Sequence, residues 1–481
     1  MAFSPFEANL AMFFENVELR GLKAVKIQKQ MWSAVEFEQG FKEFYPQIRR
    51  SLIRGAHMIS EQSGVSFSRA LGKSFRQTIG RIFSTSSMTP CTMLSGHLQA
   101  TVQRCAADST DWIVVAQDTV YYNYSGQQSM EGLGTIQGNV KGVVQHNVLA
   151  VNERGVPMGL IHQHNWTRQG AYAPEKESQK WEEGLQAVNE HLRQVAQSKK
   201  VVVVQDREAD IFAFFKAHRE PGVELVVRLY QNRKFETPET RTIAKLADAV
   251  RGLPVLGTQQ TQVRRQNRDV NLTLRIQAAP IHVLPHKDLS AQLHKTQGLS
   301  LVVATEIAAT DENGKDYFDE SKPAQWILLT SLKANDLSEA ARVVRCYSMR
   351  WAVERFHFTC KTGALQVENF QFDDIHTTLN ALAFYSIIAW RILFLTLSVR
   401  QNPMQDPEAY FDPIEMKVLC THDPQARSSL DMAIRTLGKL VNFVPTKKQP
   451  YPGIKIMAEA LRKLEDLAAF LRILNEKTLQ D

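Results

Sequence analysis

The spacing of apolar and polar residues changes several times along the chain. Up to about residue 105 the apolar positions recur at helical spacing, as in SFSRALGKSFRQTIGRIFS, and predict helices. From residue 111 the runs WIVVAQD, KGVVQHNVLAV and GVPMGLIHQHNW predict three strands, of which the last two flank the turn-like NERG as an antiparallel hairpin. We therefore expect a helical segment followed by a sheet.

Helices and strands alternate in the next segment. EKESQKWEEGLQAVNEHLRQVAQ has helical spacing, KKVVVVQD predicts a buried strand, ADIFAFFKAH a helix and VELVVRLY a further strand. The predicted order is strand, strand, strand, helix, strand, helix, strand. The hairpin keeps the first three strands antiparallel, and the helical crossover then permits a parallel fourth strand. This is the order of a ribonuclease-H-like sheet.

Residues 235–332 interrupt this order with strand-like stretches between Gly, Asp and Pro turns, and we interpret them as a β-rich insertion. Helical patterning resumes after them and continues to the end of the sequence. The predicted α/β architecture has a ribonuclease-H-like catalytic core in two parts and helical domains on both flanks. Its segments are a helical N-terminal domain over 1–105, core over 106–234, insertion over 235–332, core over 333–370 and a helical C-terminal domain over 371–481.

The longest apolar stretch, ALAFYSIIAWRILFLTLSV, carries Arg391 in its middle. Because a charge at the centre of a bilayer is costly, the stretch predicts a buried core helix and no membrane partner. The first residues lack the basic and apolar regions of a signal peptide. The five cysteines have no CxxC spacing, so neither a zinc ribbon nor a disulfide framework is indicated, and a reducing, cytoplasmic location is favoured.

The charge balance is moderately basic, with 57 Lys and Arg against 50 Asp and Glu and a net charge of +7. This suits a polyanionic partner but does not by itself select one. Seven basic residues accompany the apolar positions of the N-terminal helices: Arg49, Arg50, Arg54, Arg69, Lys73, Arg76 and Arg81. They form either a solvated basic face or a module that faces phosphates.

Two predicted strands, the first and the fourth, end on an acid, Asp118 and Asp206. Carboxylate oxygens suit Mg²⁺, and a pair of such ions about 3.5–4 Å apart can activate an attacking oxygen and stabilise a leaving one. A single aspartate at a strand end is more often a turn or helix-capping residue. The joint position of the two acids favours the metal site.

A third acid comes from a helix predicted over 340–365. At about 100° per residue, four polar residues lie within about 60° of one another. They are Tyr347, Arg350, Glu354 and Lys361. Trp351, Val353 and Phe356 spread apolar groups over the rest of the helix, so we expect it to be buried, with a polar stripe suited to metal and phosphate. A solvated face is the alternative.

The segments AQDTVYYNY, VVVVQDREADIF and YSMRWAVERFHFTCKTG resemble the three acid-bearing segments of the bacterial DDE transposases of the IS-four family, most of all the branch that contains the Tn-five transposase. The Y-x2-R-x3-E-x6-K signature of that family is present as Tyr347, Arg350, Glu354 and Lys361. DREAD at 206–210, EKES-K-W at 175–181 and the ILLTS after Trp326 extend the resemblance, which covers about residues 40 to 475.

This resemblance implies a cut-and-paste transposase in which Asp118, Asp206 and Glu354 bind two Mg²⁺ ions, with Mn²⁺ as a substitute. A metal-activated water would nick the transposon end, the freed 3′-hydroxyl would form a hairpin, a second water would open it, and the 3′-hydroxyl would attack target DNA. The implied partners are double-stranded transposon ends, target DNA and a second copy of the chain in a paired-end complex. The implied location is the bacterial cytoplasm, at the nucleoid during action.

The resemblance also assigns contacts to DNA. Tyr347, Arg350 and Lys361 would grip phosphates beside the cleavage point. Trp326 would stack on a base flipped out near the transposon end, and its alternative role is packing in the core of a strand. Arg228 matches a position near the DNA, and its alternative is a solvated arginine at a strand end.

The chain departs from the family at Phe358, where the Tn-five branch carries a lysine, and over about the first 25 residues. The C-terminal LGKLVNFVPTKKQPYPGIKIMAEALRKLEDLAAFL resembles the dimerisation region, although its apolar stripe equally suits packing within the chain. Two other functions stay open. One is a ribonuclease-H-like nuclease that uses the same acids but joins no strands, and the other is a catalytically silent DNA-binding regulator.

Overall fold

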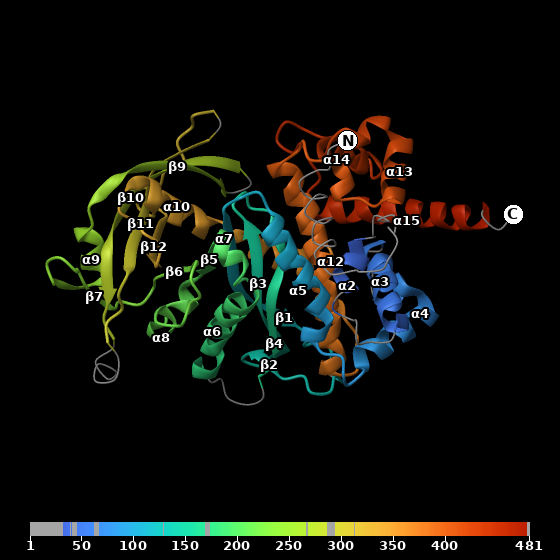
Figure 1. The fold of residues 1–481 in the computed structure, drawn as a ribbon, viewed down its shortest axis with the longest axis horizontal. Helices are drawn as coiled ribbons and strands as arrows, with labels where there is room; N and C mark the ends of the chain where they lie inside the picture. Colours follow the sequence, from blue (N-terminus) through green and yellow to red (C-terminus); the bar gives the residue numbers. More distant parts are fainter. Residues whose placement is uncertain are drawn as a thin grey trace, which may run out of the picture. The chain divides into compact units, whose positions relative to one another are not determined.

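The computed structural model describes residues 32–478 apart from 39, 41–45, 62–66, 128, 169–173, 266–267, 286–293 and 312. The chain divides into two compact units, and Figure 1 labels their helices and strands. Unit 1 comprises Met1–Thr110, Thr119–Tyr172 and Ala352–Asp481, and unit 2 comprises Asp111–Asp118 and Ala173–Trp351.

Unit 1 consists mainly of helices around a β-hairpin. The helices are α2 (Trp32–Phe37), α3 (Pro46–Glu61), α4 (Phe67–Ser84), α5 (Pro90–Ala107), α11 (Trp351–Phe358, from its second residue), α12 (Ile375–Gln401), α13 (Pro413–His422), α14 (Leu430–Lys439) and α15 (Ile454–Thr478). The hairpin pairs β3 (Val140–Asn152) with β4 (Pro157–Trp166) in antiparallel fashion, as predicted, and the short β2 (Thr135–Gln137) also pairs with β3.

The helix starts follow from local sequence. Thr89 caps α5 by accepting a hydrogen bond from the Thr92 backbone N–H at 3.1 Å, and Pro90 follows at a position where the missing donor costs nothing. Asp374 caps α12 in the same way through the Thr377 N–H at 2.7 Å. Side-chain capping therefore sets where these two long helices begin.

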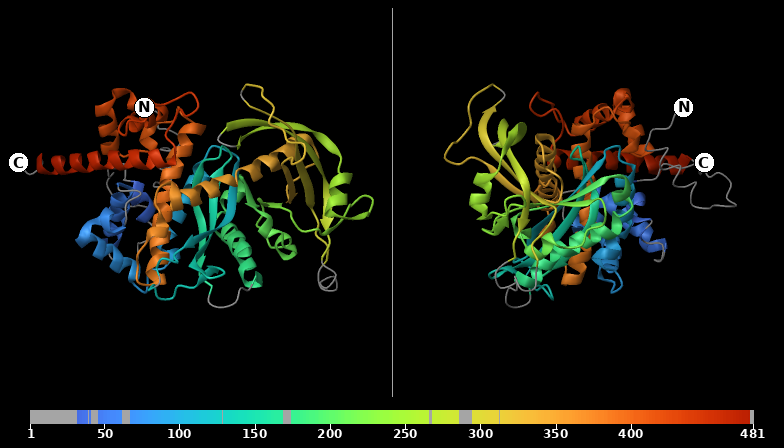
Figure 2. Two further views of the ribbon diagram at one scale, coloured as in Figure 1. Left: turned by 180° about the vertical axis from the view of Figure 1, so that it is seen from behind. Right: turned by 60° about the vertical axis from the view of Figure 1, so that its left-hand side comes forward.

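Helix α12 forms the core of unit 1. It packs against α4, α5 and β4, and the views in Figure 2 show it beside α5. The helix is long and apolar enough to cross a membrane, but 94% of its most apolar window is buried inside the protein. Arg391 is buried and pairs with Glu415 of α13 at 3.2 Å. The prediction of a core helix is confirmed.

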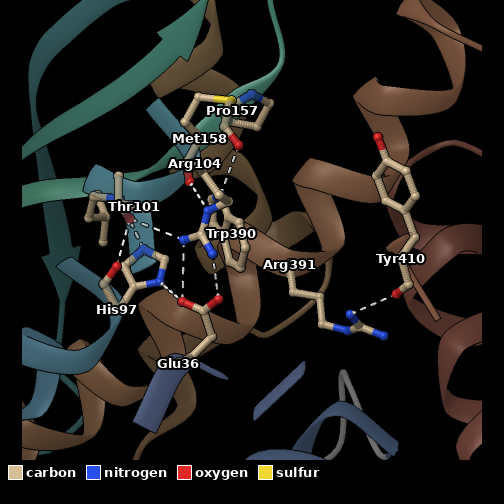
Figure 3. Close-up of polar contacts among 10 residues, drawn as sticks. Glu36, His97, Thr101, Arg104, Pro157, Met158, Trp390, Arg391 and Tyr410 are labelled. Carbon is tan, nitrogen blue, oxygen red and sulfur yellow. Dashed lines mark hydrogen bonds and ion pairs between the residues drawn. The ribbon is translucent and has the colours of Figure 1, made fainter. Parts of the chain in front are cut away.

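A buried charged cluster fixes β4 against α5 and α12 (Figure 3). Glu36 of α2 accepts hydrogen bonds from His97 at 2.5 Å and from Arg104 at 2.7 Å. The other ring nitrogen of His97 accepts the Leu160 N–H at 3.0 Å, and Arg104 also binds the Met158 carbonyl. Each buried charge therefore has a partner, which removes most of the cost of burying it.

One glycine permits this close packing. Gly159 of β4 has a φ of 142°, and a Cβ at this position would overlap the Thr101 hydroxyl of α5. Trp390 of α12 completes the contact by donating its indole N–H to the Pro157 carbonyl at 2.9 Å. Strand β4 is thus held by both α5 and α12.

His97 makes the stability of the fold depend on pH. Burial lowers the pKa of His97, and the nearby Arg104 charge acts in the same direction, against the opposing effect of Glu36. His97 is therefore protonated less readily in the folded chain than in the unfolded chain, where it takes up a proton below a pH of about 6.5. The free energy of unfolding should fall as the pH drops below this value, by at most ~1.4 kcal/mol per pH unit from this one group.

Urea unfolding of wild type and His97→Gln between pH 7.5 and 5.5 measures this contribution. The wild-type midpoint should fall more steeply with decreasing pH than that of the variant. The side chain of His218 is 78% exposed, so His218→Gln is a matched control that should follow the wild-type slope. Equal slopes for His97→Gln and wild type would refute the assignment to His97.

Unit 2 is a sheet covered by helices. Its strands are β1 (Trp112–Asn123, up to Asp118), β5 (Lys200–Gln205), β6 (Val223–Arg228), β7 (Lys234–Glu236), β8 (Ile243–Lys245), β9 (Val255–Arg265), β10 (Arg268–Val283), β11 (Leu299–Asp311) and β12 (Gln325–Thr330). Its helices are α6 (Pro174–His191), α7 (Val195–Ser198), α8 (Phe212–Phe215), α9 (Leu246–Gly252) and α10 (Leu337–Ser348), with the short 3₁₀ turn η1 (Arg207–Ala209) after β5.

The strands of unit 2 are ordered β1-β5-β6-β12-β11-β10-β7-β8, and β9 pairs with the other part of β10. The pairs β1–β5 and β5–β6 are parallel, which confirms the predicted parallel fourth strand after a helical crossover. Strand β12 pairs antiparallel with β6, from Leu328 opposite Arg228 to Thr330 opposite Val226. The β-rich residues therefore continue the sheet of the core.

Candidate active site

The paired parts of strands β1 and β5 each lead towards an acid. Trp112 pairs with Lys200 and Ala116 with Val204, an offset of 88 residues (200 minus 112). The same offset carried two residues further matches Asp118 with Asp206 (206 minus 118). The pairing itself ends at Ala116 and Val204, so the two acids stand just beyond the paired residues of two neighbouring parallel strands.

Asp118 lies differently from the prediction. We expected it at a strand end, but β1 continues through it to Asn123. What ends is the pairing of β1 with β5, whose last matched residue on β1 is Ala116. Asp118 keeps 17% of its side chain exposed and binds Arg350, with 3.3 Å between the carboxylate and the guanidinium. The acid is thus at the point where the neighbouring strand turns away.

Asp206 follows the last residue of β5, as predicted. It caps η1, because its Oδ1 accepts the Glu208 N–H at 2.9 Å. Burial raises the pKa of Asp206, and the Glu208 carboxylate adds to this, whereas the backbone hydrogen bond and the charges of Arg350 and Lys180 lower it. The carboxylate is therefore both a turn cap and a poorly solvated charge that a nearby cation stabilises.

Lys180 is a buried cation that sequence reasoning did not single out. Its side chain on α6 is only 7% exposed, and its ammonium lies 3.0 Å from the Glu208 carboxylate in the turn that follows Asp206. A buried ammonium needs a charged partner to offset its lost hydration. In the sequence Lys180 belongs to the spacing EKES-K-W, which contributed to the family resemblance but did not indicate this contact with Glu208.

Asp210, the second acid of DREAD, has a structural role. It is fully buried and accepts the Tyr230 N–H at 2.8 Å, the Gln231 N–H at 2.7 Å and the Arg233 Nε–H at 2.7 Å. It therefore fixes the segment that follows β6 and Arg228. Arg228 itself, at the end of β6, donates to the Gln325 carbonyl at 3.2 Å.

Trp326 and Tyr347 lie together in unit 2, with ring centroids 5.9 Å apart and planes tilted by 60°. Tyr347 is buried, whereas Trp326 on β12 is half-buried. Trp326 also lines a cavity of about 240 Å³. The other lining residues are Gln259, Gln260, Thr261, Val344, Arg345 and Ser348. An indole face beside a cavity is compatible with either of the roles considered for Trp326.

The helix predicted over 340–365 is interrupted. Helix α10 ends at Ser348, α11 begins at Trp351, and a π-helical turn follows over Thr359–Gly363. The Ser348 hydroxyl binds the Arg345 carbonyl at 2.7 Å, and the Arg350 N–H binds the Tyr347 carbonyl at 3.0 Å, so the last turn tightens and stops.

The prediction of one continuous helix was therefore wrong, because a constant step of 100° does not carry from Tyr347 to Lys361, and the shared face of the four polar residues stays a prediction. Trp351, expected to be buried, is 41% exposed, whereas Val353 and Phe356 are fully buried.

Glu354 and Lys361 belong to unit 1, on α11 and on the π-helical turn. Glu354 is exposed. The Lys361 ammonium donates to the Tyr121 carbonyl at 2.8 Å and pairs with Glu368 at 3.1 Å. The Arg355 guanidinium lies over the Phe358 ring, with 4.8 Å between its central carbon and the ring centroid. Unit 2 thus brings Asp118, Asp206 and Arg350 together, and the convergence of Glu354 on them stays a prediction.

The acid pair suits a divalent cation. Both side chains offer the oxygen ligands that Mg²⁺ and Mn²⁺ prefer. Asp118 already attracts one cation, Arg350, and burial leaves the charge of Asp206 poorly solvated. Together they make a local excess of weakly hydrated negative charge, which is what a metal site requires.

A comparison with known families agrees with this chemistry. Residues 176–390 match the family model described as a transposase DDE domain. The matched segment contains Asp206, Arg228, Trp326, Tyr347, Arg350, Glu354 and Lys361, whereas Asp118 precedes it. Proteins with this domain act on DNA and use divalent metal ions, and the domain implies a ribonuclease-H-like fold. The protein is therefore a DDE transposase, a metal-dependent nuclease and strand transferase that acts in DNA transposition and recombination.

Proposed function

We propose that the protein is a cut-and-paste transposase of the IS-four type, similar to the Tn-five transposase. The observation that carries the proposal is the acid pair, Asp118 and Asp206, which follow the paired residues of two neighbouring parallel strands, with Arg350 against Asp118. The Tyr347, Arg350, Glu354 and Lys361 signature inside the matched domain supports it. The proposed layout is the one read from the sequence: a helical end-binding domain, a core split by the β-rich insertion, and a helical C-terminal dimerisation domain.

Asp118, Asp206 and Glu354 would hold Mg²⁺, with Mn²⁺ as a substitute. The bound ions would supply Lewis-acid activation of a phosphodiester. The residues of the chain would do the positioning. Arg350 carries a guanidinium that can exchange its contact with Asp118 for a DNA phosphate, and Tyr347 would add a hydroxyl as a further phosphate contact. Lys361 would add a phosphate contact by leaving its pairing with Glu368.

The proposed partners are two transposon ends and a target duplex, held by a homodimer in the bacterial cytoplasm. The net charge of +7 favours association with DNA. Helix α15 packs against α3 and α13 within unit 1, so part of its apolar stripe serves the chain itself. Dimerisation would use what remains exposed, such as Phe470, which is 60% exposed.

A paired-end joining assay tests the function. The substrate is a plasmid with the inverted ends that flank the gene, incubated with target plasmid and MgCl₂. A cut-and-paste transposase releases the fragment through hairpin ends and joins it to the target. A nuclease without strand transfer gives cuts without joined product, and a silent regulator binds the ends without cutting them. Either of these results would reject the proposal.

Trp326→Ala should separate two steps of this reaction. We expect the first nick to proceed near the wild-type rate and hairpin formation to slow by roughly 5- to 150-fold, because stacking a base on an aromatic ring contributes about 1–3 kcal/mol. Denaturing gels of end-labelled DNA resolve nick and hairpin over time. Trp326→Phe, which keeps a stacking surface, should recover most of the rate. Equal loss at both steps would reject the stacking role.

A further inference from the structure

Four amides, three of them buried and one half-buried, occupy one face of the β3–β4 hairpin. Gln145 pairs across the strands with Asn165, and Asn147 pairs with Gln163. Gln145 and Asn147 are fully buried, Gln163 is 8% exposed and Asn165 is half-buried. A hairpin face that packs on a core is normally apolar. Four amides in two facing pairs therefore need an explanation.

The four amides form a closed ring of hydrogen bonds that runs in one direction. Gln145 donates to Asn165 at 2.8 Å, and Asn165 donates to Gln163 at 3.3 Å. Gln163 donates to Asn147 at 2.9 Å, and Asn147 donates back to Gln145 at 2.9 Å. Within the ring each amide donates one hydrogen bond and accepts one, so each bond polarises the next. Reversing one amide would bring two donors face to face.

Three side chains from other elements attach to this amide ring. The Tyr122 hydroxyl of β1 donates to Gln145 at 3.2 Å, and the second N–H of Gln163 reaches the Ser386 hydroxyl of α12 at 2.9 Å. The second N–H of Asn147 meets the His357 Nε2 of α11 at 3.1 Å. An amide nitrogen can only donate, so Nε2 of His357 must accept, which fixes the tautomer of the ring.

These attachments join the segments that bear the acids. Tyr122 follows Asp118 by four residues on β1, and His357 follows Glu354 by three residues on α11. His357 is 8% exposed, whereas Glu354 is exposed, so the histidine anchors the inner side of the helical turn that carries the acid. The apolar neighbours Val353 and Phe356 bury that turn without directing it, because hydrophobic contact is non-directional.

We propose that the amide ring, acting through His357, positions Glu354 for metal binding and catalysis. The inference rests on the proposed role of Glu354 as the third acid. His357 is a positioning residue, since it acts through the helix and not on the substrate. The ring supplies orientation that the core does not, because hydrogen bonds are directional and hydrophobic contact is not.

The test compares His357→Phe with Ser386→Ala. Both remove one partner of the same ring, but Ser386 is on α12, which carries none of the proposed site residues. Mn²⁺ binding to the DNA-free protein, followed by electron paramagnetic resonance, and single-turnover cleavage are the two readouts. In His357→Phe we expect metal affinity or cleavage to fall by about 10- to 100-fold, the usual effect of losing an outer-shell partner. DNA-end affinity should stay unchanged, and Ser386→Ala should match wild type in all three measurements.

A conservative variant adds a rescue. His357→Gln can place an amide oxygen near the former Nε2 position and should recover much of the lost activity, which loss of packing alone does not predict. If His357→Phe fails to give a folded protein, Tyr122→Phe and Ser386→Ala decide, since each deletes one hydroxyl at the amide ring. Tyr122→Phe should then slow cleavage more than Ser386→Ala.

Two results would count against different claims. The positioning role would fail if His357→Phe and Ser386→Ala had equal metal affinity and cleavage, or if Tyr122→Phe and Ser386→Ala slowed cleavage equally. The amide ring would then contribute only to packing of the core. Glu354→Gln serves as the reference: if it retains metal affinity and cleavage, the proposed role of Glu354 fails whatever the ring variants do.

Discussion

Asp206→Asn is expected to lower the rate of DNA cleavage on the order of a thousandfold or more, as loss of a central catalytic group does. The substitution removes charge from a carboxylate that burial already keeps poorly solvated beside Arg350. It keeps an oxygen that can accept the Glu208 N–H, so the η1 turn should survive. Single-turnover cleavage and gel-shift assays with the transposon end should show lost cleavage with nearly unchanged binding.

The chain provides a matched control for this substitution. Asp406 also caps a 3₁₀ turn, and its Oδ1 accepts the Glu408 N–H at 2.9 Å, the same distance as at Asp206. Asp406→Asn should leave cleavage at the wild-type rate. If both variants lose cleavage alike, or if Asp206→Asn retains it, the metal role of Asp206 is wrong.

Asp210→Asn is expected to act on stability, with a loss of about 3–5 kcal/mol, because it breaks a buried ion pair by removing one partner. The fully buried carboxylate accepts from two backbone N–H groups and from Arg233, and an asparagine must turn its NH₂ toward one of these donors. The expected result is a lower urea midpoint for the unfolding of unit 2, followed by the fluorescence of its tryptophans.

A solvent-exposed pair of the same type is the control. Asp248 pairs with Arg251 on α9, and their side chains are 57% and 76% exposed. Asp248→Asn should cost between 0 and about 1 kcal/mol, the range for surface ion pairs. A similar small cost for Asp210→Asn would show that the Asp210 contacts do not hold the segment after β6. The two acids of one DREAD motif should thus separate activity from stability.

The sequence predicted the regular parts of the fold well. The apolar runs that end at Asp118 and Asp206, and the helix between the hairpin and the second run, were sufficient to predict the parallel β1–β5 pair. The interior charge at Arg391 correctly indicated a core helix. These features are local or follow from topological rules, so one sequence contains enough information to predict them.

Features that depend on distant contacts were missed. The break between α10 and α11 arises from hydrogen bonds at Ser348 and Arg350 that helical periodicity cannot detect. The polar positions Gln145 and Asn147 alternate along β3 and helped to predict a strand, but alternation alone suggests a solvated face. In the fold their partners come from distant elements: Asn147 donates to His357 of α11, 210 residues later, and Gln163 on the neighbouring strand donates to Ser386 of α12.

The register of β1 against β5 has a further consequence for how the enzyme tolerates change. Val201, Val202, Val203 and Val204 are interchangeable in size, so the strand could slide by one residue without losing apolar burial. The fully buried amides of Gln117 and Gln205 are the exceptions to this apolar pattern. A shift of β5 by one residue would turn Asp206 toward the opposite side of the sheet. We therefore expect exchanges among aliphatic residues of similar size in the run to leave the chemistry intact, and insertion or deletion of a single residue there to abolish it.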